Sequence, residues 1–459
     1  MKLDKNLKHH IRKNRYYYSQ LIKYLRFYIP SGSSVLDVGC GNGTLLSALK
    51  PKRGLGIDSN RAAIADAKKR HPKLDFLNNK AEKFASTETF DYILLCNSIG
   101  SVHDIQTVLE HLKKNCHRET RIIIFHYSFL WWPLLKLAEK LKLKRPDGIQ
   151  NWVGAQDVSN FLALSGYDII SQSTKIIAPL WIPVLSNLAN KYLANLPLLN
   201  KLNLMHVTIA RVPRPLTGDE TSASIIIPAR NEMGNIESAI TRTPTLGTST
   251  EFIFIEGGSS DDTWKEIQRV AEKYKQTHTI KFAKQTGRGK GDAVRKGYSL
   301  ATNNVLYILD ADLTMPPEEL PKFHEQICSG RGEFINGSRL VYPMEQKAMR
   351  PLNLIGNKTF SLIFTFLLRQ RFKDTLCGTK VLTRTNYNKI AQGRSYFGDF
   401  DPFGDFDLLF GAAKQNLKII EVPIHYKERT YGDTNISRWK HGMILLRMCI
   451  FASRKIKFI

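Results

Sequence analysis

The 459-residue sequence lacks a long apolar run. Its longest uncharged stretch, Ile176–Asn190, includes two prolines and two asparagines. A membrane-spanning helix needs about 20 mostly apolar residues, so we expect no transmembrane segment. Residues 1–10 begin with basic side chains but no apolar core follows them, so we also expect no secretory signal.

The sequence is poor in cysteine, and its cysteines form neither a C-x-x-C pair nor the spacing of a metal site. Scattered cysteines are typical of a reducing compartment, which favours a cytoplasmic location. They carry no further chemical signal. The six are Cys40, Cys96, Cys116, Cys328, Cys377 and Cys449.

Acidic residues are few relative to basic ones. The chain has 67 Lys and Arg against 41 Asp and Glu, a net charge of +26, and the excess is shared by both halves. A surface this basic attracts nucleic acid, phosphorylated substrates or an anionic membrane face. The apolar share of 42% is ordinary for a globular protein, which excludes a disordered or fibrous chain.

The length exceeds that of a usual single domain, so we expect two. The best boundary is Pro213–Ser222, which is rich in Pro, Thr and acids and has no apolar periodicity. We expect two α/β domains in series, 1–212 and 223–459, with parallel sheets built from alternating strands and helices. The expected strands are Ser34–Val38, Arg53–Ile57, Tyr92–Cys96, Arg121–Phe125, Val207–Arg211, Ala223–Ile227, Glu251–Ile255, Thr279–Ala283, Val305–Leu309, Glu333–Asn336 and Leu417–Val422.

In the first domain, an apolar strand runs into three alternating glycines, Gly39, Gly41 and Gly43. Glycines are needed where the backbone turns sharply against a ligand that faces a helix N-terminus. Asp37 precedes the first glycine, where a carboxylate suits a cationic ligand better than a pyrophosphate. Asp58 ends the next strand, where it can accept hydrogen bonds from ribose hydroxyls.

These residues resemble class I S-adenosylmethionine-dependent methyltransferases over Val35–Phe125, with a Rossmann-like fold. The resemblance implies that the glycine loop cradles the methionine part of S-adenosylmethionine and that Asp58 holds its ribose. It also implies that Glu82 lies near the adenine and that Asn97, at the end of the fourth-strand motif, faces the transferred methyl group. A non-catalytic or NAD-binding domain is the alternative.

The methyl acceptor is less well indicated. His103 and His126 both follow strand ends, and either could deprotonate a hydroxyl acceptor. The segments Tyr127–Arg145 and Ile176–Leu204 are rich in apolar residues. They could close over a lipidic acceptor or rest on a membrane, or they could be ordinary helices that pack on the sheet.

In the second domain, polar residues follow three strands. The first strand breaks at Pro228 into a loop that contains Asn231 and Glu232, and the second ends at Glu256 before small residues and Asp261. Carboxylates at such positions accept from sugar or base hydroxyls and amides.

A glycine loop and a carboxylate pair complete the pattern. Gly287–Ala293 includes Arg288 and Lys290, which suit a diphosphate, together with Asp292. Asp310 and Asp312 then stand two apart at a strand end. Oxygen ligands of this kind hold Mg²⁺ or Mn²⁺, which neutralises phosphate charge.

This set resembles family 2 glycosyltransferases of the GT-A fold, especially the dolichyl- and polyprenyl-phosphate mannosyl- or glucosyltransferases, over Ala223–Gly442. The resemblance implies a nucleotide sugar donor, a divalent metal held by Asp310 and Asp312, and a polyprenyl phosphate acceptor. The family usually has Asp-Asp-Gly-Ser where this chain has Glu256-Gly257-Gly258-Ser259, which leaves the nucleotide base open. The substrate-binding residues implied are Pro228, Asn231, Glu232, Glu256, Asp261, Arg288, Lys290, Asp292, Arg339, Arg350 and Arg438, with Arg339 and Arg350 at the lipid phosphate.

The resemblance implies inverting transfer without a covalent enzyme intermediate. A phosphate acceptor is already anionic, whereas a hydroxyl acceptor would need a base. Asp405 or Asp407, in the acidic segment Gly398–Asp407, would be that base. A solvated acidic loop is the alternative for this segment.

Membrane contact is expected from two segments, Thr359–Lys373 and the basic tail Arg438–Ile459, which are suited to lie in an anionic membrane interface. We therefore expect a bifunctional transferase that is peripheral on the cytoplasmic membrane face. Two alternatives remain: a glycosyltransferase whose first domain only binds or docks, and a basic nucleic-acid-binding protein. Against the latter, the basic residues form no recognition motif, so no nucleic acid is expected.

Overall fold

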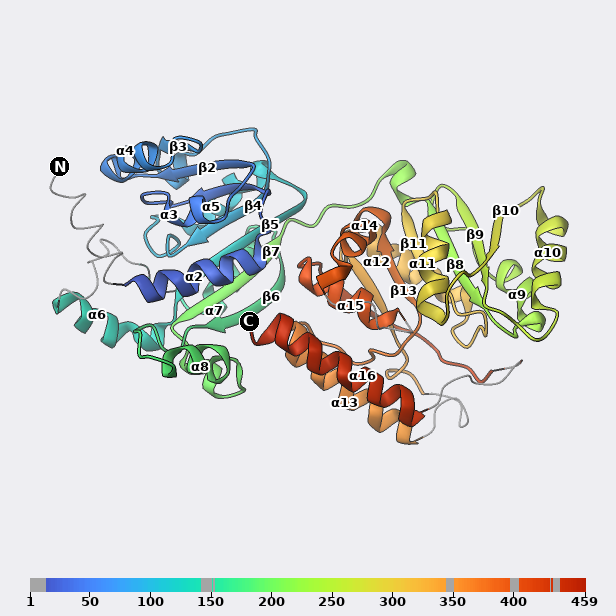
Figure 1. Ribbon diagram of the computed structural model, residues 1–459. Coiled ribbons are helices and arrows are strands. Elements are labelled where there is room, and N and C mark those ends of the chain that lie inside the picture. The colour runs from blue at the N-terminus through green and yellow to red at the C-terminus, as the bar shows by residue number, and fades with distance from the viewer. Residues whose placement is uncertain are drawn as a thin grey trace. The chain divides into compact units, whose positions relative to one another are not determined.

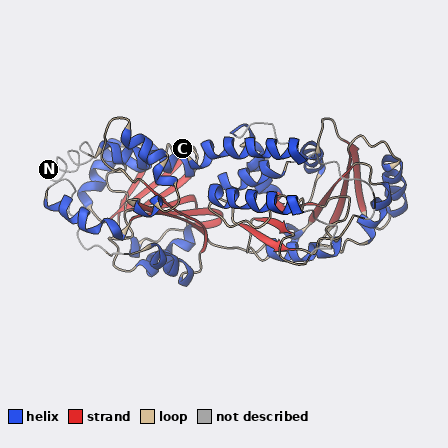
Figure 2. Cartoon of the chain, turned by 90° about the horizontal axis from the view of Figure 1, so that it is seen from below, coloured by secondary structure: helices blue, strands red, loops and turns tan. Residues whose placement is uncertain are grey.

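The computed structural model describes residues 14–141, 151, 153–343, 351–396, 404–429, 431 and 438–459, with the backbone alone for 351–353, 405 and 438–441. The chain divides into two compact units, Met1–Pro213 and Arg214–Lys457. Each has its own sheet, with helices on both sides of the strands (Figures 1 and 2). We describe the N-terminal and C-terminal units separately.

The N-terminal unit contains a seven-stranded sheet in the order β3-β2-β1-β4-β5-β7-β6. The first five strands in this order are parallel, and β7 is antiparallel to both of its neighbours. The bounds are β1 Ser34–Val38, β2 Arg53–Asp58, β3 Asp75–Asn78, β4 Phe90–Cys96, β5 Cys116–Tyr127, β6 Asp168–Lys175 and β7 Met205–Arg211.

Helices cover both faces of this sheet, so its central strands are apolar on both sides. Residues Ile122–Phe125 of β5 are completely buried, and Ile122 and Ile124 pack in one core with Leu36 and Ile93. The helices are α2 Arg15–Tyr28, α3 Thr44–Ala48, α4 Arg61–Arg70, α5 Ile105–Leu112, α6 Trp132–Lys140, α7 Ala155–Leu164 and α8 Leu185–Lys191.

The C-terminal unit contains a second seven-stranded sheet, in the order β10-β9-β8-β11-β13-β12-β14. Its strands are parallel except for β13, which is antiparallel to both β11 and β12. The bounds are β8 Ala223–Ala229, β9 Thr250–Glu256, β10 Thr279–Lys284, β11 Val305–Ile308, β12 Phe334–Ser338, β13 Lys380–Thr383 and β14 Ile419–Pro423.

The helices of this unit flank the sheet (Figure 1). None of the helices in the described ranges combines the length and apolarity needed to cross a bilayer. Their bounds are α9 Ile236–Thr241, α10 Thr263–Tyr274, α11 Lys290–Leu300, α12 Leu320–Cys328, α13 Pro351–Leu368, α14 Arg384–Gln392, α15 Asp405–Lys414 and α16 Arg438–Ala452.

The α/β class and the two domains in series are confirmed, but both sheets are mixed rather than parallel. Every expected strand is present. Three strands were missed, β3, β6 and β13, because β3 and β13 have only four residues and β6 is largely polar. In the expected linker, Gly218–Thr221 form a 3-10 turn that Thr217 and Glu220 cap.

Candidate active sites

The glycine loop of the N-terminal unit follows β1. Gly39, Gly41 and Gly43 all have positive φ, a conformation that favours glycine. A Cβ at Gly39 would overlap Ser98, which follows β4, whereas a Cβ at Gly41 would meet nothing within 4 Å. The first glycine therefore lets the loop pack against β4, and the second leaves open space beside the loop.

Two aspartates support this loop. Asp58 accepts hydrogen bonds from the backbone N–H groups of Gly41 and Asn60, both at 2.8 Å, so it ties the ends of β1 and β2 together. Asp37 is 2% exposed. Its burial, and secondly the charge of Asp58, raises the pKa of Asp37 to about 7. A cation bound beside Asp37 would favour its ionised form.

Glu82 and Asn97 lie on the loops that follow β3 and β4. Glu82 accepts a hydrogen bond from the backbone N–H of His103 at 2.8 Å. Burial acts to raise the pKa of Glu82, but backbone N–H groups hold it below its ordinary value. Asn97 has a φ of +57° and donates through Nδ2 to the Tyr17 hydroxyl at 3.0 Å. Its buried Oδ1 has no partner among the described residues.

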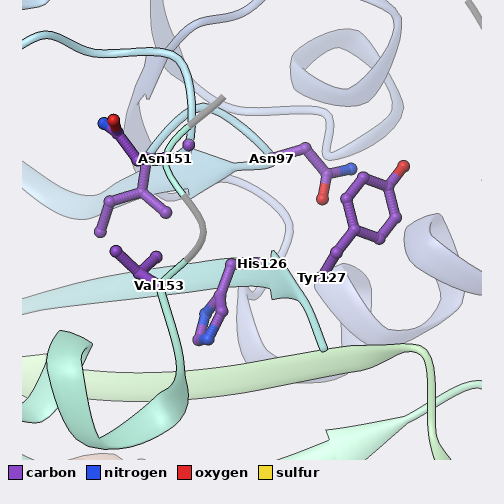
Figure 3. A pocket seen from close by; sticks show the side chains of 7 residues that line it. Asn97, His126, Tyr127, Asn151 and Val153 are labelled. Atoms are coloured by element: carbon purple, nitrogen blue, oxygen red, sulfur yellow. The ribbon is translucent and has the colours of Figure 1, made fainter. Parts of the chain in front are cut away.

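A small pocket lies at the carboxyl ends of β4 and β5. Figure 3 shows Asn97 and Tyr127 on one side of it and the ring of His126 turned away from them. His126 stacks on His206 of β7 with ring centroids 5.2 Å apart. Burial, then His206, lowers the pKa of His126 to about 3, so the ring is neutral at physiological pH. The pocket is lined by Asn97, Ile99, Gly100, His126, Tyr127, Asn151 and Val153.

Tyr17 is a residue of this region that the sequence reasoning missed. It belongs to α2, and its hydroxyl lies 3.3 Å from that of Tyr127. Burial raises the pKa of Tyr17 far above its ordinary value, so it stays a neutral hydroxyl. The run of three tyrosines at 16–18 was the available signal.

In the C-terminal unit, the loops after β8 and β9 are joined by hydrogen bonds. Asn231, at a φ of +58°, accepts from the Ser260 backbone N–H at 2.7 Å and donates its own backbone N–H to Ser259 Oγ at 3.0 Å. Glu256 accepts from the Ser259 backbone N–H at 2.5 Å. Asp261 accepts from the Tyr431 hydroxyl at 3.3 Å. These polar residues thus form one continuous edge, as expected at the carboxyl ends of parallel strands.

The first aspartate after β11 is paired with the basic loop. Lys290 Nζ lies 2.5 Å from Asp310 Oδ1. Burial acts to raise the pKa of Asp310, but Lys290, followed by Lys380 and Arg339, lowers it below its ordinary value. A Cβ at Gly378 would overlap Asp310 and approach Lys290 to 2.5 Å, so a larger residue there would displace this ion pair. Asp310 is therefore an ionised carboxylate, with a third of its side chain exposed.

The second aspartate is held by an arginine from the segment after β14. Arg429 donates to Asp312 Oδ2 at 2.6 Å and to Glu232 Oε1 at 2.9 Å. Asp312 also accepts from the hydroxyl of Thr314 at 2.9 Å, and Glu232 accepts from Asn235 at 2.8 Å. Burial raises the pKa of Glu232 to about 7. Arg429 thus connects the β8 loop to the carboxylate pair.

An internal hydrogen bond fixes the conformation of the basic loop before α11. Asp292 accepts a hydrogen bond from the Gly287 backbone N–H at 2.8 Å, while Arg288 between them is exposed. Gly404, which precedes α15, packs against the start of α11: a Cβ on it would lie 2.8 Å from Gly291 Cα. The chain at Asp405 is thereby brought next to Lys290.

Other expected site residues have partners of their own. Arg339 donates to Asp374 through Nε at 2.7 Å and through a terminal nitrogen at 2.9 Å. Asp407 accepts from Arg394 at 2.8 Å. Arg350 lies outside the described residues, as do the side chains of Asp405 and Arg438.

The structure therefore brings most of the expected residues into two groups. The first joins Asp37, the three loop glycines and Asp58, with Glu82 and Asn97 on the following loops. The second joins Asn231, Glu232, Glu256, Asp261, Lys290, Asp310 and Asp312. Three more residues belong to the second group: Gly378 from the loop before β13, Lys380 from β13 and Arg429 from the segment after β14. Their segments support the resemblance to family 2, but no role in the site was predicted for these residues from the sequence.

The folds and sites define two transferase-type units, each with its polar groups at the carboxyl ends of parallel strands. Residues 224–389 match the family model of glycosyl transferase family 2, and residues 9–172 match that of a methyltransferase domain. The chain belongs to glycosyl transferase family 2 and carries a methyltransferase domain in its N-terminal unit, which makes it a transferase.

The curated relatives match the C-terminal half. A dolichol-phosphate mannosyltransferase of Pyrococcus furiosus is 35% identical over 225 residues, which are 46% of this chain and 58% of that protein. Glycosyltransferase AglJ of Haloferax volcanii is 30% identical over 224 residues, 48% and 68% of the two chains. An undecaprenyl-phosphate 4-deoxy-4-formamido-L-arabinose transferase of Klebsiella pneumoniae is 33% identical over 218 residues, 47% and 62%. The chain thus spans about three fifths of the length of these relatives.

Two solved structures are similar to parts of the chain. A S-adenosylmethionine-dependent methyltransferase of Thermotoga maritima, a possible histamine N-methyltransferase, has 15% identity and a TM-score of 0.36, covering 46% of this chain and 96% of that one. Glucosyl-3-phosphoglycerate synthase of Mycobacterium tuberculosis has 15% identity and a TM-score of 0.37, covering 51% and 80%.

Proposed function

We propose that the C-terminal unit transfers a hexose from a nucleotide sugar to a polyprenyl phosphate. The observation that carries this proposal is the pair of aspartates after β11, each held by a cation: Lys290 pairs with Asp310, and Arg429 pairs with Asp312. Both aspartates lie within the region that matches family 2. Two of the similar proteins are named for dolichol-phosphate and undecaprenyl-phosphate sugar transfer, which supports the choice of acceptor.

The proposed transfer is a single displacement with inversion. An oxygen of the acceptor phosphate attacks the anomeric carbon, the bond from that carbon to the nucleoside diphosphate breaks, and the diphosphate leaves with the electron pair. Lys290 and the exposed Arg288 would stabilise its developing charge. Because the acceptor is already an anion, no general base is required, and Asp405 or Asp407 would serve only a hydroxyl acceptor.

A divalent cation fits the carboxylate pair. Asp310 and Asp312 offer oxygen atoms, the ligand type that Mg²⁺ and Mn²⁺ prefer, and Asp310 is ionised and partly exposed. Within the described ranges no cluster of three or more His, Cys, Asp and Glu side chains could hold a metal. The pair would therefore share the ion with donor phosphate oxygens and water, and the ion would neutralise phosphate charge there.

We further propose that the N-terminal unit binds S-adenosylmethionine and transfers its methyl group to an unidentified acceptor of the lipid-linked or glycan class. The residues present fit the cofactor. Among the described residues, no cation contributes to the pKa of Asp37, and the buried atoms Asn97 Oδ1 and Asn42 Nδ2 have no partners. Gly41 leaves open space beside the loop. When bound, the cofactor supplies an electrophilic methyl group. The protein would orient it through Asp37 and Asp58. His126 is the candidate base for a hydroxyl acceptor and is neutral, but its lowered pKa makes it a weaker base than an ordinary histidine.

We propose that the C-terminal unit associates peripherally with the cytoplasmic face of a membrane through α13 and α16. Both helices have exposed apolar side chains, Ile355 and Leu362 on α13 and Met443, Leu446 and Ile450 on α16. Residues 438–459 contain basic side chains and no acidic ones, which suits anionic headgroups.

One experiment tests both transfers. The purified chain is incubated with short-chain polyprenyl phosphate, a panel of nucleotide sugars, Mg²⁺ or Mn²⁺, and S-adenosylmethionine, and the lipids are analysed by mass spectrometry. The expected result is a hexosyl phosphate lipid that requires the metal and is absent with Asp310→Ala/Asp312→Ala. Undiminished product from that variant would overturn the glycosyl transfer. Titration calorimetry that detects no S-adenosylmethionine binding would overturn the methyl transfer.

A further inference from the structure

The N-terminal unit has an exposed apolar surface. In the described part of this unit, all exposed large apolar side chains except Leu77 and Leu164 lie within residues 129–141 and 180–202. The two segments are joined, because Trp131 donates through its indole N–H to the Leu202 carbonyl at 2.8 Å. Figure 1 shows α6 and α8, which these segments contain, on the same side of the unit. We call the exposed side chains of the two segments the α6–α8 face.

Two thirds of the side chains of this face come from an excursion that the sheet does not need. β6 and β7 are antiparallel neighbours, and Lys175 pairs directly with Met205. A two-residue turn could join strands in this register. Instead, residues 176–204 leave the sheet and return to the same point, with α8 between them. The excursion therefore requires an explanation other than the fold of the sheet.

The excursion has polar side chains inside and apolar ones outside. Ser186, Asn190, Asn195 and Asn203 are at most 3% exposed, whereas Trp181 is 63% exposed. The buried amides are hydrogen-bonded: Asn190 Oδ1 accepts from the backbone N–H groups of Ile177 and Ala178, both at 2.9 Å. A soluble surface normally has the opposite pattern, so the exposed apolar side chains are fitted to an apolar environment.

Two strained turns display apolar side chains at the edge of the excursion. Val184 and Leu198 each follow a proline and have φ of +63° and +68°, a conformation rare for residues other than glycine. In each turn the next residue donates its backbone N–H to that proline's carbonyl, at 2.6 Å for Leu185 and 2.9 Å for Leu199. These are classic γ-turns, which are uncommon. Their side chains are 68% and 75% exposed, among the most exposed apolar ones of the unit.

The charges on the face indicate what covers it. Residues 176–204 contain Lys191 and Lys201 and no acidic residue. Lys191 also lies near Lys23 of α2, and after burial its charge is the second cause that lowers the pKa of Lys23. Tryptophan and lysine around an aliphatic surface are typical of the boundary between headgroups and acyl chains. A lipid phosphate between Lys23 and Lys191 would relieve the repulsion between these two side chains.

We propose that the α6–α8 face docks the N-terminal unit on an anionic lipid bilayer. In this arrangement Trp181, Val184 and Leu198 insert among the upper acyl chains, and Lys191 and Lys201 meet the lipid phosphates. The contact belongs to the unit that carries the methyltransferase domain, so it uses other residues than α13 and α16 and does not depend on sugar transfer. It would keep a lipid-linked methyl acceptor close to the pocket at Asn97.

A local probe on the full-length chain tests this contact without interference from α13 and α16. Val184→Cys and Leu198→Cys are labelled with a polarity-sensitive dye and mixed with vesicles of equal parts phosphatidylcholine and phosphatidylglycerol. Leu164→Cys is the matched control, because Leu164 is 61% exposed on the same unit but outside the face. The unsubstituted chain corrects for labelling of its own cysteines.

The expected result is a blue shift with vesicles at positions 184 and 198 and no shift at 164. The signal should weaken with added salt or without phosphatidylglycerol, because exposed charges are screened. In the 184 variant, Trp181→Ser/Leu198→Ser should weaken vesicle affinity about tenfold or more. Equal shifts at 164, no shift at 184 and 198, or a shift that depends on protein concentration without vesicles would overturn the proposal; the last would mean that a second copy covers the face.

Discussion

The ammonium group of Lys290 lies 2.5 Å from Asp310 Oδ1, where α11 begins and β11 has just ended. This ion pair joins the basic glycine loop to the carboxylate motif. Lys290 is the strongest of the cations that lower the pKa of Asp310. The pair thus fixes a positive charge beside the proposed diphosphate site and keeps Asp310 ionised.

Lys290→Met should lower kcat/KM for the nucleotide sugar by about 10²–10³, because the departing diphosphate loses a positioned cation. Release of nucleoside diphosphate is the measurement. Lys281→Met is the matched control, since Lys281 pairs with Glu251 at 2.7 Å outside the site. Its activity per folded molecule should equal that of the unsubstituted chain. Equal activities of the two variants would contradict a catalytic role for Lys290.

Gly378→Ala should abolish transfer while the C-terminal unit stays folded. A Cβ at this position would overlap Asp310 and approach Lys290 to 2.5 Å, so the ion pair must separate. Gly442→Ala is the control: it lies within α16, and a Cβ there would meet nothing within 4 Å. Alanine favours a helix by roughly 1 kcal/mol over glycine, so this variant should be active and slightly more stable. Full activity of Gly378→Ala would show that the pair is not needed.

Arg339→Met should destabilise the C-terminal unit by about 3–5 kcal/mol, because it leaves Asp374 buried without its cation. Hydrogen exchange of the β12 and β13 amides would measure the loss. Arg242→Met, which breaks an exposed pair with Glu318, should cost at most about 1 kcal/mol. Similar losses of stability in both variants would refute the structural role of Arg339. The predicted contact with the lipid phosphate would then be its main role.

The sequence was informative where one short segment carries both the structure and the chemistry. The strand before Gly39 and the strand before Asp310 are apolar runs that end in glycines or carboxylates, so strand, loop and ligand type could be read together. The resemblance to two families added the cofactor and donor. The two-unit α/β fold and both family memberships were predicted in this way and are confirmed.

The sequence was uninformative where distant segments meet. Arg429 lies more than a hundred residues from Asp312, and only the parallel pairing of β14 with β12 brings its segment back to the site. β13 is a four-residue strand that reverses the sheet direction, so neither its existence nor the position of Lys380 could be inferred from periodicity. Tyr17 reaches Asn97 through tertiary packing of α2.

Asp37 provides a pH-dependent test of the cofactor site. The pKa of Asp37 is about 7, above the ordinary 3.8. Its contribution to the free energy of unfolding is therefore complete below about pH 4 and is lost as the pH rises through about 7. Relative to Asp37→Asn, the free energy of unfolding of the unsubstituted N-terminal unit should therefore fall by up to a few kcal/mol over this pH range. Thermal unfolding at several pH values would measure it, and a pH-independent difference would contradict the raised pKa.

Binding of S-adenosylmethionine should reverse this shift, because its sulfonium and ammonium charges favour the ionised form of Asp37. Binding at about pH 6 should then release up to one proton, and affinity should rise with pH until it levels off above about pH 7. Calorimetry in two buffers of different ionisation heat measures the proton release. Asp37→Asn should bind more weakly and release no proton, whereas Asp75→Asn, at an exposed position on β3 of the same sheet, should behave as the unsubstituted chain. Proton release that persists in Asp37→Asn would place the titrating group elsewhere and remove Asp37 from the cofactor site.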